Sequence, residues 1–356
     1  MKISIPKETH PGEPRTPMTP ASVAKLVKLG AQVEVEAGLG LGSSHADADY
    51  VAAGATVTSD RKALISSGDM VLRLRKPPVE EIEWLKPGSV HVSLLDPFNE
   101  KTLVDKLAAR NVSAISLELV PRSTRAQKMD VISSQANLGG YVAVILAAHN
   151  GNKIFPMMMT PAGTILPSKV FIIGAGVAGL QAIATAKRLG AKVTAYDTRP
   201  VVEEQVKSLG AQFLKIDLGE TGQTKDGYAK ALTDEQIQKQ RAAMNKTCGD
   251  SDVVITTAQV FGRKAPVLVT AEMLNAMKPG SVVIDMAVES GGNVEGVKYN
   301  EVIDRNGVKI IGIANLPGRA PLHASQVYAA NLVSLIEEFC DKNEKTFVLK
   351  LDDEII

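Results

Sequence analysis

The chain has 356 residues, and 40 lysines and arginines against 39 aspartates and glutamates give a formal net charge of +1. This balance provides no broad field to attract nucleic acid or acidic lipid. Hydrophobic residues make up 45% and charged residues 22%, which excludes a disordered chain. The longest uninterrupted apolar run, residues 141–148, is too short to cross a bilayer, and the N-terminus lacks the pattern of a signal peptide. We therefore expect a cytoplasmic protein of two domains.

The two cysteines give no sign of metal binding or of a disulfide framework. Cys248 and Cys340 lie far apart in the sequence, and neither belongs to a CxxC pair. We expect two buried thiols and no metal site.

Short β-branched runs alternate with helical stretches in the first third of the chain, which is typical of βα units on a parallel sheet. The first helix has clear ends, with Thr19 as N-cap, Pro20 in the first turn and Gly30 just beyond the last turn. The predicted strands are residues 3–5, 33–35, 71–74, 90–92 and 114–117.

A second series of the same kind begins near residue 169. Long helices are expected at residues 133–149, between the two series, and at residues 322–339, after the second. Residues 346–351 are predicted to form a last strand that rejoins the first domain. The predicted strands of the second series are residues 169–173, 192–196, 212–214, 253–255, 282–284 and 310–311.

Together these elements predict an α/β protein with two Rossmann-like parallel-sheet domains joined by two long helices. The first domain, residues 1–132 plus 320–356, is discontinuous in sequence, and the second covers residues 133–319. A cleft between the domains is the expected ligand site. Residues 217–229 form a polar, glycine-rich stretch that is far longer than an ordinary βα connection. This stretch is either a lid or a surface insertion without a role.

The glycine-rich segment from Gly174 to Gly179 carries the strongest functional signal. It follows a predicted strand and opens a helix, which is the order of a dinucleotide-binding turn. Gly174 permits the tight turn, Gly176 lets the backbone approach a pyrophosphate, and Gly179 lets helix and strand pack closely. Asp197 follows Gly174 by 23 residues, at the end of the next strand, where an acid accepts the ribose 2′-hydroxyl. NAD(H) is therefore the expected cofactor.

Two alternatives remain open for this segment. Arg199 lies two residues beyond Asp197 and could meet a 2′-phosphate, which would favour NADP(H), although the Asp197 carboxylate would repel that phosphate. The glycine run could also be a βα turn without a ligand. The predicted nucleotide contacts at this turn are Gly174, Ala175, Gly176, Val177, Ala178, Gly179, Asp197, Thr198 and Arg199.

A second polar segment, residues 121–137, follows a predicted strand at the start of the first long helix. Gln127 and Asp130 offer hydrogen-bond acceptors and Arg122 offers a fork of donors, which suits a nicotinamide carboxamide. On chemistry alone, a solvated helix start with capping residues explains the segment equally well.

This second segment resembles a family motif. Arg122 and residues 125–127, 129–130 and 133–137 look like the signature loop of the NAD(H)-binding component of proton-translocating nicotinamide nucleotide transhydrogenase. The resemblance covers essentially the whole chain and implies that the loop positions the nicotinamide of NADH. The residues that inherit this role are Arg122, Gln127, Asp130 and Ser133, with Lys128 and Met129 as loop neighbours.

The resemblance extends to the second domain. It implies that Tyr228, together with Gly227, closes the lid over a bound nucleotide. Gln240 and Ala258 also fall at nucleotide contacts of the family. Gln259 stands at such a contact too, but where the family is expected to have an aliphatic residue.

The same two-domain fold occurs in alanine dehydrogenase, which is the first alternative. Oxidation of an amino acid needs a general base. The catalytic histidine expected after the fourth strand is replaced here by Asp96, and His91 lies within the strand, as a structural residue would. Arg75 stands in place of the substrate lysine. We expect Arg15, Arg75 and Lys76 to form structural ion pairs.

Direct hydride transfer between two nicotinamides needs no base, only two C4 atoms held close with water excluded. The resemblance thus implies a homodimeric transhydrogenase component that passes hydride between NADH and NADP+ held on an NADP(H)-binding partner. Its position would be cytoplasmic, peripheral to the inner face of the membrane, where a proton-channel component couples the transfer to proton movement. Alone it would bind nucleotide without turnover. A non-catalytic NAD(H)-sensing or scaffold module is the second alternative.

Overall fold

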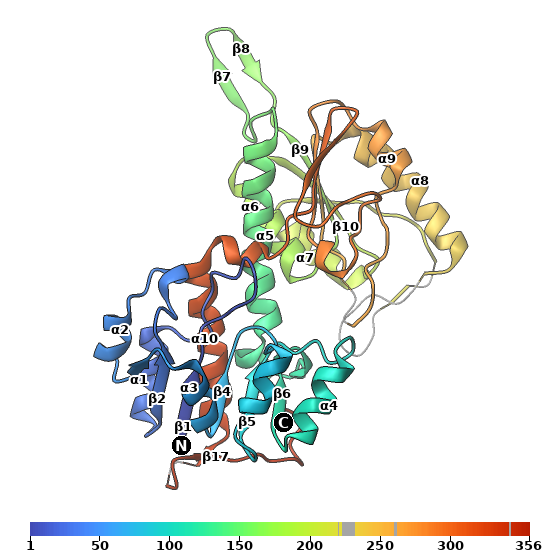
Figure 1. Ribbon diagram of the computed structural model, residues 1–356. Coiled ribbons are helices and arrows are strands. Elements are labelled where there is room, and N and C mark those ends of the chain that lie inside the picture. The colour runs from blue at the N-terminus through green and yellow to red at the C-terminus, as the bar shows by residue number, and fades with distance from the viewer. Residues whose placement is uncertain (220, 223–231, 260–261, 342) are drawn as a thin grey trace. The chain divides into compact units, whose positions relative to one another are not determined.

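The structure, a computed structural model, describes residues 1–219, 221–222, 232–259, 262–341 and 343–356. The chain divides into two compact units, drawn in Figure 1. Unit 1 consists of Met1–Gln135 and Pro317–Ile356, and unit 2 consists of Ala136–Leu316. Unit 1 is therefore built from both ends of the chain.

Unit 1 contains a six-stranded sheet in the order β3-β2-β1-β4-β5-β6, in which every neighbouring pair is parallel. This is a doubly wound sheet, with its topological switch point between β1 and β4. The short edge strand β3 is not among the predicted strands. The strands are β1 (Lys2–Ile5), β2 (Gln32–Glu36), β3 (Thr56–Thr58), β4 (Met70–Leu72), β5 (Val90–Ser93) and β6 (Ser113–Ser116).

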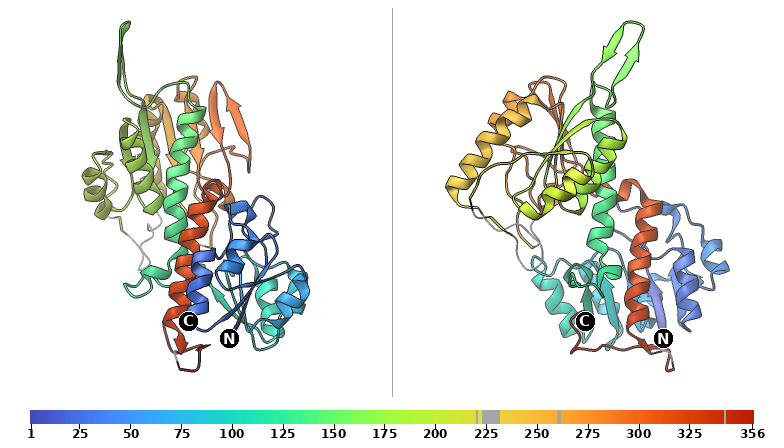
Figure 2. Two further views of the ribbon diagram at one scale, coloured as in Figure 1. Left: turned by 90° about the vertical axis from the view of Figure 1, so that its left-hand side faces the viewer. Right: turned by 180° about the vertical axis from the view of Figure 1, so that it is seen from behind.

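The helices of unit 1 cover this sheet and close one hydrophobic core. Helix α1 begins at Pro20 as predicted, although the Thr19 side chain does not cap its backbone and instead lies 3.3 Å from the Ser22 hydroxyl. Helix α10 packs alongside α1, as Figure 2 shows, and contributes Tyr328, Leu332 and Ile336 to the core. The helices are α1 (Pro20–Lys28), α2 (Asp47–Ala52), α3 (Arg61–Ser67), α4 (Lys101–Ala109) and α10 (Pro321–Glu338).

The end of the chain differs from the prediction of a last strand over residues 346–351. Strand β17 (Thr346–Phe347) is shorter and pairs antiparallel with β16 (Cys340–Asp341), in a separate two-stranded sheet. Charged residues are interspersed in the sequence after β17, and too few apolar side chains remain to extend a buried strand. Cys340 on β16 is only half-buried, so the prediction of two buried thiols holds for Cys248 alone.

Unit 2 contains a seven-stranded sheet in the order β11-β10-β9-β12-β13-β15-β14. Its first six strands are parallel and repeat the strand order of unit 1, and β14 adds an antiparallel edge that the sequence did not predict. The switch point lies between β9 and β12. The strands are β9 (Lys169–Ile173), β10 (Lys192–Tyr196), β11 (Gln212–Phe213), β12 (Val253–Thr256), β13 (Val282–Asp285), β14 (Val302–Arg305) and β15 (Val308–Ile311).

Four helices accompany this sheet, and they are α6 (Val177–Arg188), α7 (Glu203–Ser208), α8 (Asp234–Asp250) and α9 (Ala271–Ala276). Helix α8 begins with a capping box, in which Thr233 and Gln236 each bond the other's backbone N–H. Buried side chains of α8, α9 and the central strands form the core on one face of the sheet.

Helix α5 (Val131–Asn150) begins in unit 1 and continues in unit 2. By length and composition alone it could span a membrane, although polar residues interrupt its apolar sequence. Its apolar character also follows from packing, because Ala143, Val144 and Ala147 are fully buried. The second crossing between the units is made at Leu316–Pro317, before α10 begins, so α10 lies wholly within unit 1 and does not join the units as predicted.

After α5 the chain forms an unpredicted hairpin of β7 (Met158–Thr160) and β8 (Gly163–Ile165), which extends away from the sheet of unit 2 in Figure 1. Apolar side chains of the hairpin face solvent, and Met159 and Leu166 are 81% and 76% exposed. An isolated two-stranded hairpin is only marginally stable in water. Its exposed face therefore needs a partner to account for it.

Candidate functional site

The glycine turn after β9 has the geometry that its sequence predicts. Gly174 adopts φ of +100°, a conformation that L side chains rarely adopt. A Cβ added to Gly179 would lie 1.9 Å from the Gly174 carbonyl oxygen, so only glycine lets α6 pack this closely. A Cβ on Gly176 would meet only Arg199 Nη2, at 3.8 Å. The backbone beside Gly176 is therefore open to a ligand.

Helix α6 starts at Val177 with Gly176 as its N-cap, and no side chain caps its first turn. Val177 is exposed and Ala178 is half-buried, whereas Ala175 is buried. The uncapped N–H groups and the helix dipole favour an anion at this end. A pyrophosphate fits this open backbone cradle.

The Asp197 carboxylate lies at the end of β10 and is already hydrogen-bonded. Its Oδ2 accepts the Ala175 backbone N–H at 2.7 Å and Arg199 Nη2 at 2.7 Å. Its Oδ1 accepts the backbone N–H of Arg199 and Arg199 Nε, both at 2.9 Å. The bond to Asp197 raises the pKa of the Arg199 guanidinium, so this side chain stays charged. The half-buried Thr198 lies between them in sequence.

Residues that the sequence did not single out support the turn from the neighbouring strands. The Thr257 hydroxyl lies 3.1 Å from the Gly174 carbonyl oxygen and fills the space that a side chain at 174 would need. Asn293, fully buried, donates to the Ala258 carbonyl at 2.9 Å and accepts the Ala258 N–H at 3.2 Å. Asp285 in turn accepts the Asn293 N–H at 2.7 Å. These long-range pairs leave no local signal in the sequence.

The remaining predicted contacts of unit 2 have different outcomes. Gln240 is buried on α8, and its amide donates to the Tyr196 hydroxyl at 3.1 Å, which makes it a packing residue of the sheet. Gln259 is exposed and donates to the Met286 carbonyl at 3.0 Å. Gly227 and Tyr228 lie outside the described residues, as does most of the predicted lid.

In unit 1, the polar loop includes a 3-10 turn at Gln127–Met129 and leads into α5. The Asp130 carboxylate accepts the Ser133 N–H at 2.8 Å and the Ser133 hydroxyl at 2.6 Å, so these two residues cap the helix start. Arg122 and Gln127 are exposed. The helix-capping interpretation is thus correct for two of the four predicted residues, and their capping fixes where the loop ends.

The predictions for Lys128 and Met129 need correction. Met129 is fully buried in the core of unit 1, because the 3-10 turn directs its apolar side chain inward, so it offers no side chain to a cofactor. Lys128 pairs with Glu338 of α10 at 2.7 Å, and its carbonyl accepts the Asn331 amide at 2.8 Å. These contacts fasten the loop to α10.

The last residues of the chain also contact this loop. Arg125 pairs with Asp353 and, at 3.2 Å, with Glu338. The Ser123 hydroxyl donates to Glu354 at 2.8 Å. Ile355 is buried in the same core as Met129. The polar loop is therefore held between α10 and the segment that ends the chain.

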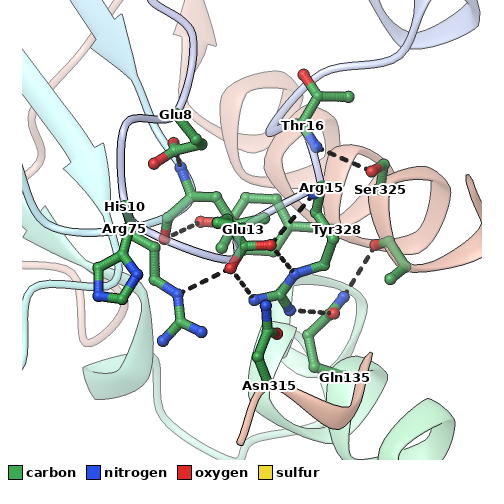
Figure 3. A network of polar contacts seen from close by, with 12 residues as sticks. Glu8, His10, Glu13, Arg15, Thr16, Arg75, Gln135, Asn315, Ser325 and Tyr328 are labelled. Carbon is green, nitrogen blue, oxygen red and sulfur yellow. Dashed lines mark hydrogen bonds and ion pairs between the residues drawn. The ribbon is translucent and has the colours of Figure 1, made fainter. Parts of the chain in front are cut away.

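The switch point of unit 1 contains a network of buried charges, shown in Figure 3. The Glu13 carboxylate receives Arg15 Nη2 at 2.6 Å and Arg75 Nε at 2.9 Å. Burial alone would raise the pKa of Glu13, but hydrogen bonds and charge from Arg15 and Arg75 outweigh it and lower the pKa to about 2. Lys76 pairs with Glu100. The predicted ion pairs are thus confirmed for all three basic residues.

His91 lies on β5 and is fully buried, with Nε2 3.1 Å from the Ser93 hydroxyl. Burial, reinforced by the charge of Arg73, lowers its pKa to about 3. A neutral histidine of this basicity is not a general base at neutral pH. Asp96 follows the strand at φ of +55° and accepts the Asn99 amide at 2.8 Å. Within the described ranges, no group of three or more His, Cys, Asp or Glu side chains gathers to hold a metal.

Comparison with known proteins agrees with this geometry. The family model described as "Alanine dehydrogenase/PNT, N-terminal domain" matches residues 4–139, and its C-terminal counterpart matches residues 143–356. The chain belongs to the alanine dehydrogenase/PNT family. It is 46% identical to the first of the polypeptides that make up the NAD(P) transhydrogenase alpha subunit of Rhodospirillum rubrum, over all of this chain and 94% of that polypeptide.

Solved structures distinguish the two branches of the family. A transhydrogenase from Sinorhizobium meliloti is 45% identical with a TM-score of 0.90, and the match covers 100% of this chain and 96% of that one. An L-alanine dehydrogenase is 27% identical with a TM-score of 0.79, over 94% and 89%. Both share the α/β fold, and alanine dehydrogenase is the more distant relative.

Proposed function

We propose that the chain is the NAD(H)-binding component of a proton-translocating transhydrogenase. The observation that carries the proposal is the open glycine turn beside Asp197, in a chain that is 46% identical over its full length to a transhydrogenase alpha-subunit polypeptide. The nicotinamide of a bound NADH would supply the hydride, and an NADP(H)-binding partner would hold the acceptor. Proton movement would belong to a membrane partner, which places this chain peripheral to the cytoplasmic face.

The residues of the chain have three tasks in this proposal. The backbone from Gly174 to Gly179 and the N-terminus of α6 bind the pyrophosphate. Asp197 binds the adenosine ribose. Arg122, Gln127, Asp130 and Ser133 orient the nicotinamide, with Asp130 and Ser133 fixing the loop through the cap on α5. None of these tasks transfers a proton, which is consistent with the low basicity of His91.

The test mixes this protein with a transhydrogenase NADP(H)-binding component and follows reduction of an NAD analogue by NADPH. We expect turnover only in the mixture, with a large loss in Gln127→Asn and no loss in Gln32→Asn, an exposed glutamine of the same unit. Asp130→Asn should lose turnover as well, and its unfolding curve separates catalysis from the cap.

A parallel assay with pyruvate, ammonia and NADH tests the nearest alternative. Turnover by the isolated chain would overturn the proposal in favour of an amino-acid dehydrogenase. Binding of NADH without turnover in either assay would instead leave a sensing module.

The same proposal includes a homodimer, and the hairpin of β7 and β8 supports it. Met157, Met159 and Leu166 expose a long apolar face that a second copy of the chain could cover symmetrically. Sedimentation should give a dimer, and the pair Met159→Glu plus Leu166→Glu should give a monomer that still binds NADH. A monomer in the unaltered protein would contradict the homodimer.

A further inference from the structure

The Asp197 carboxylate has no capacity left for another donor. A carboxylate has about four lone-pair directions, two on each oxygen. Four N–H groups occupy them: the backbone donors of Ala175 and Arg199, and Nε and Nη2 of the Arg199 side chain. A ribose diol that binds Asp197 must displace two of these donors.

Only the side-chain donors can leave. The Ala175 N–H belongs to the glycine turn and the Arg199 N–H to the chain that leaves β10, so both are fixed by the fold. The guanidinium fork is held by rotatable bonds and presents the same paired donors that a ribose diol presents. The guanidinium and the diol therefore compete for one edge of the carboxylate.

The displaced guanidinium has a destination close by. Its Nη2 lies 3.8 Å from the point where a Cβ on Gly176 would be, which is the edge of the open cradle. A guanidinium binds phosphate with paired hydrogen bonds. A diphosphate in this cradle would thus offer Arg199 a new anionic partner in place of Asp197.

We propose that Arg199 is an exchangeable positioning residue, which occupies Asp197 in the free protein and moves to the diphosphate when a dinucleotide binds. This inference rests on the proposed function, because it assumes that the glycine turn binds an adenine dinucleotide. It makes Arg199 unfavourable for ribose binding and favourable for phosphate binding. The pair then selects ligands that carry both groups over nucleosides that carry ribose alone.

The test measures dissociation constants of adenosine, ADP and NADH for the unaltered protein and for Arg199→Met. We expect adenosine to bind several-fold more tightly to Arg199→Met, because Asp197 is free. We expect the ratio of the adenosine constant to the ADP constant to shrink by about tenfold, since a charged hydrogen-bond pair to phosphate is lost. The salt dependence of ADP binding should weaken as well.

Two further variants keep the result interpretable. Arg199→Lys retains a charge for phosphate but loses the fork, so adenosine should bind more tightly while much of the ADP affinity remains. Arg188→Gln removes a charge at the far end of α6 and should leave all three constants unchanged. If Arg199→Met does not fold, the Arg199→Lys measurement decides alone.

Adenosine affinity that falls or stays constant in both Arg199 variants would overturn the inference and leave Arg199 as a brace of the strand end. That result differs from failure of the proposed function. If the unaltered protein binds neither ADP nor NADH, the glycine turn is not a dinucleotide site at all.

Discussion

The two units share one strand order and use its switch point in opposite ways. In unit 2 the chain leaves β9 through a glycine turn, and backbone N–H groups at the start of α6 remain open to an anion. In unit 1 the chain leaves β1 without such a turn, and Glu8 reaches across the switch point to accept the Leu74 N–H at 2.6 Å. Glu13, Arg15 and Arg75 fill the space beyond (Figure 3).

This difference shows that the fold places a site but side chains decide whether a ligand can use it. A doubly wound sheet offers a crevice at its switch point. In unit 1 a buried carboxylate and two arginines satisfy one another there. In unit 2 the corresponding place is lined by glycine backbone, with the Asp197 and Arg199 pair beside it.

The largest expected effect tests the closed switch point. Glu13→Gln should lower the free energy of unfolding at pH 7 by about 3 kcal/mol, because the folded pKa of about 2 lies well below the ordinary value of 4.5. The stability from Glu13 is present above pH 4.5 and is lost as the pH falls towards 2. Urea unfolding between pH 7 and pH 3 measures this difference.

The control for Glu13→Gln is Glu80→Gln, an exposed glutamate of the same unit. It should unfold like the unaltered protein. ADP affinity should stay the same in both variants, because the glycine turn belongs to unit 2. Equal stability of Glu13→Gln and the unaltered protein at pH 7 would contradict the closed network.

The second effect tests the open switch point. Gly176→Ala should raise the dissociation constant of ADP by about tenfold or more, because the new Cβ occupies the surface that a phosphate would approach. The free energy of unfolding should change by less than about 1 kcal/mol, since nothing but Arg199 lies within 4 Å of that Cβ among the described residues. Calorimetric titration and urea unfolding check the two statements separately, and retained ADP affinity would refute the first.

A third, smaller effect concerns Glu8, whose carboxyl is fully buried. Burial raises its pKa despite the charge of Arg73 and the Leu74 N–H. A raised pKa means that the folded state favours the protonated form, so the stabilising contribution is lost as the pH rises above the ordinary carboxyl range. Glu8→Gln, a mimic of the protonated acid, should be slightly more stable than the unaltered protein at pH 7. Thermal unfolding at pH 5 and pH 7 should show this gain only at the higher pH.

The smallest effect on stability concerns the end of the chain. Asp353→Asn removes one partner of Arg125, and such exposed pairs contribute less than about 1 kcal/mol. In the mixed hydride-transfer assay the rate should fall several-fold with ADP affinity unchanged, because the loop loses its clamp. Arg125→Asp combined with Asp353→Arg should recover the rate. No recovery would assign the loss to something other than this pair.

The sequence predicts the units and most strands because their signals are local. Buried parallel strands such as residues 169–173 and 253–255 are apolar runs, and both match observed strands closely. Strands β3 and β14 were missed because short edge strands bury little and carry a weak pattern. The glycine turn was predictable for the same local reason, since each glycine answers a constraint within six residues.

The rest of the site depends on pairs that the sequence cannot bring together. Glu13 meets Arg75 across 62 residues, and Ala258 meets Asn293 across 35. The position of Met129 was mispredicted because its burial depends on α10, which comes much later in the chain. The full occupation of Asp197 by Arg199 is a question of geometry, which spacing alone does not describe.

The contact between residues 353–354 and the polar loop makes the C-terminus a handle on that loop. An affinity tag fused directly after Ile356 would add bulk and charge within a few residues of the partners of Ser123 and Arg125. Activity comparisons are therefore best made on protein tagged at Met1. Conversely, a small fluorophore at residue 356 would sense displacement of the loop, and its signal could follow the docking of a partner in real time.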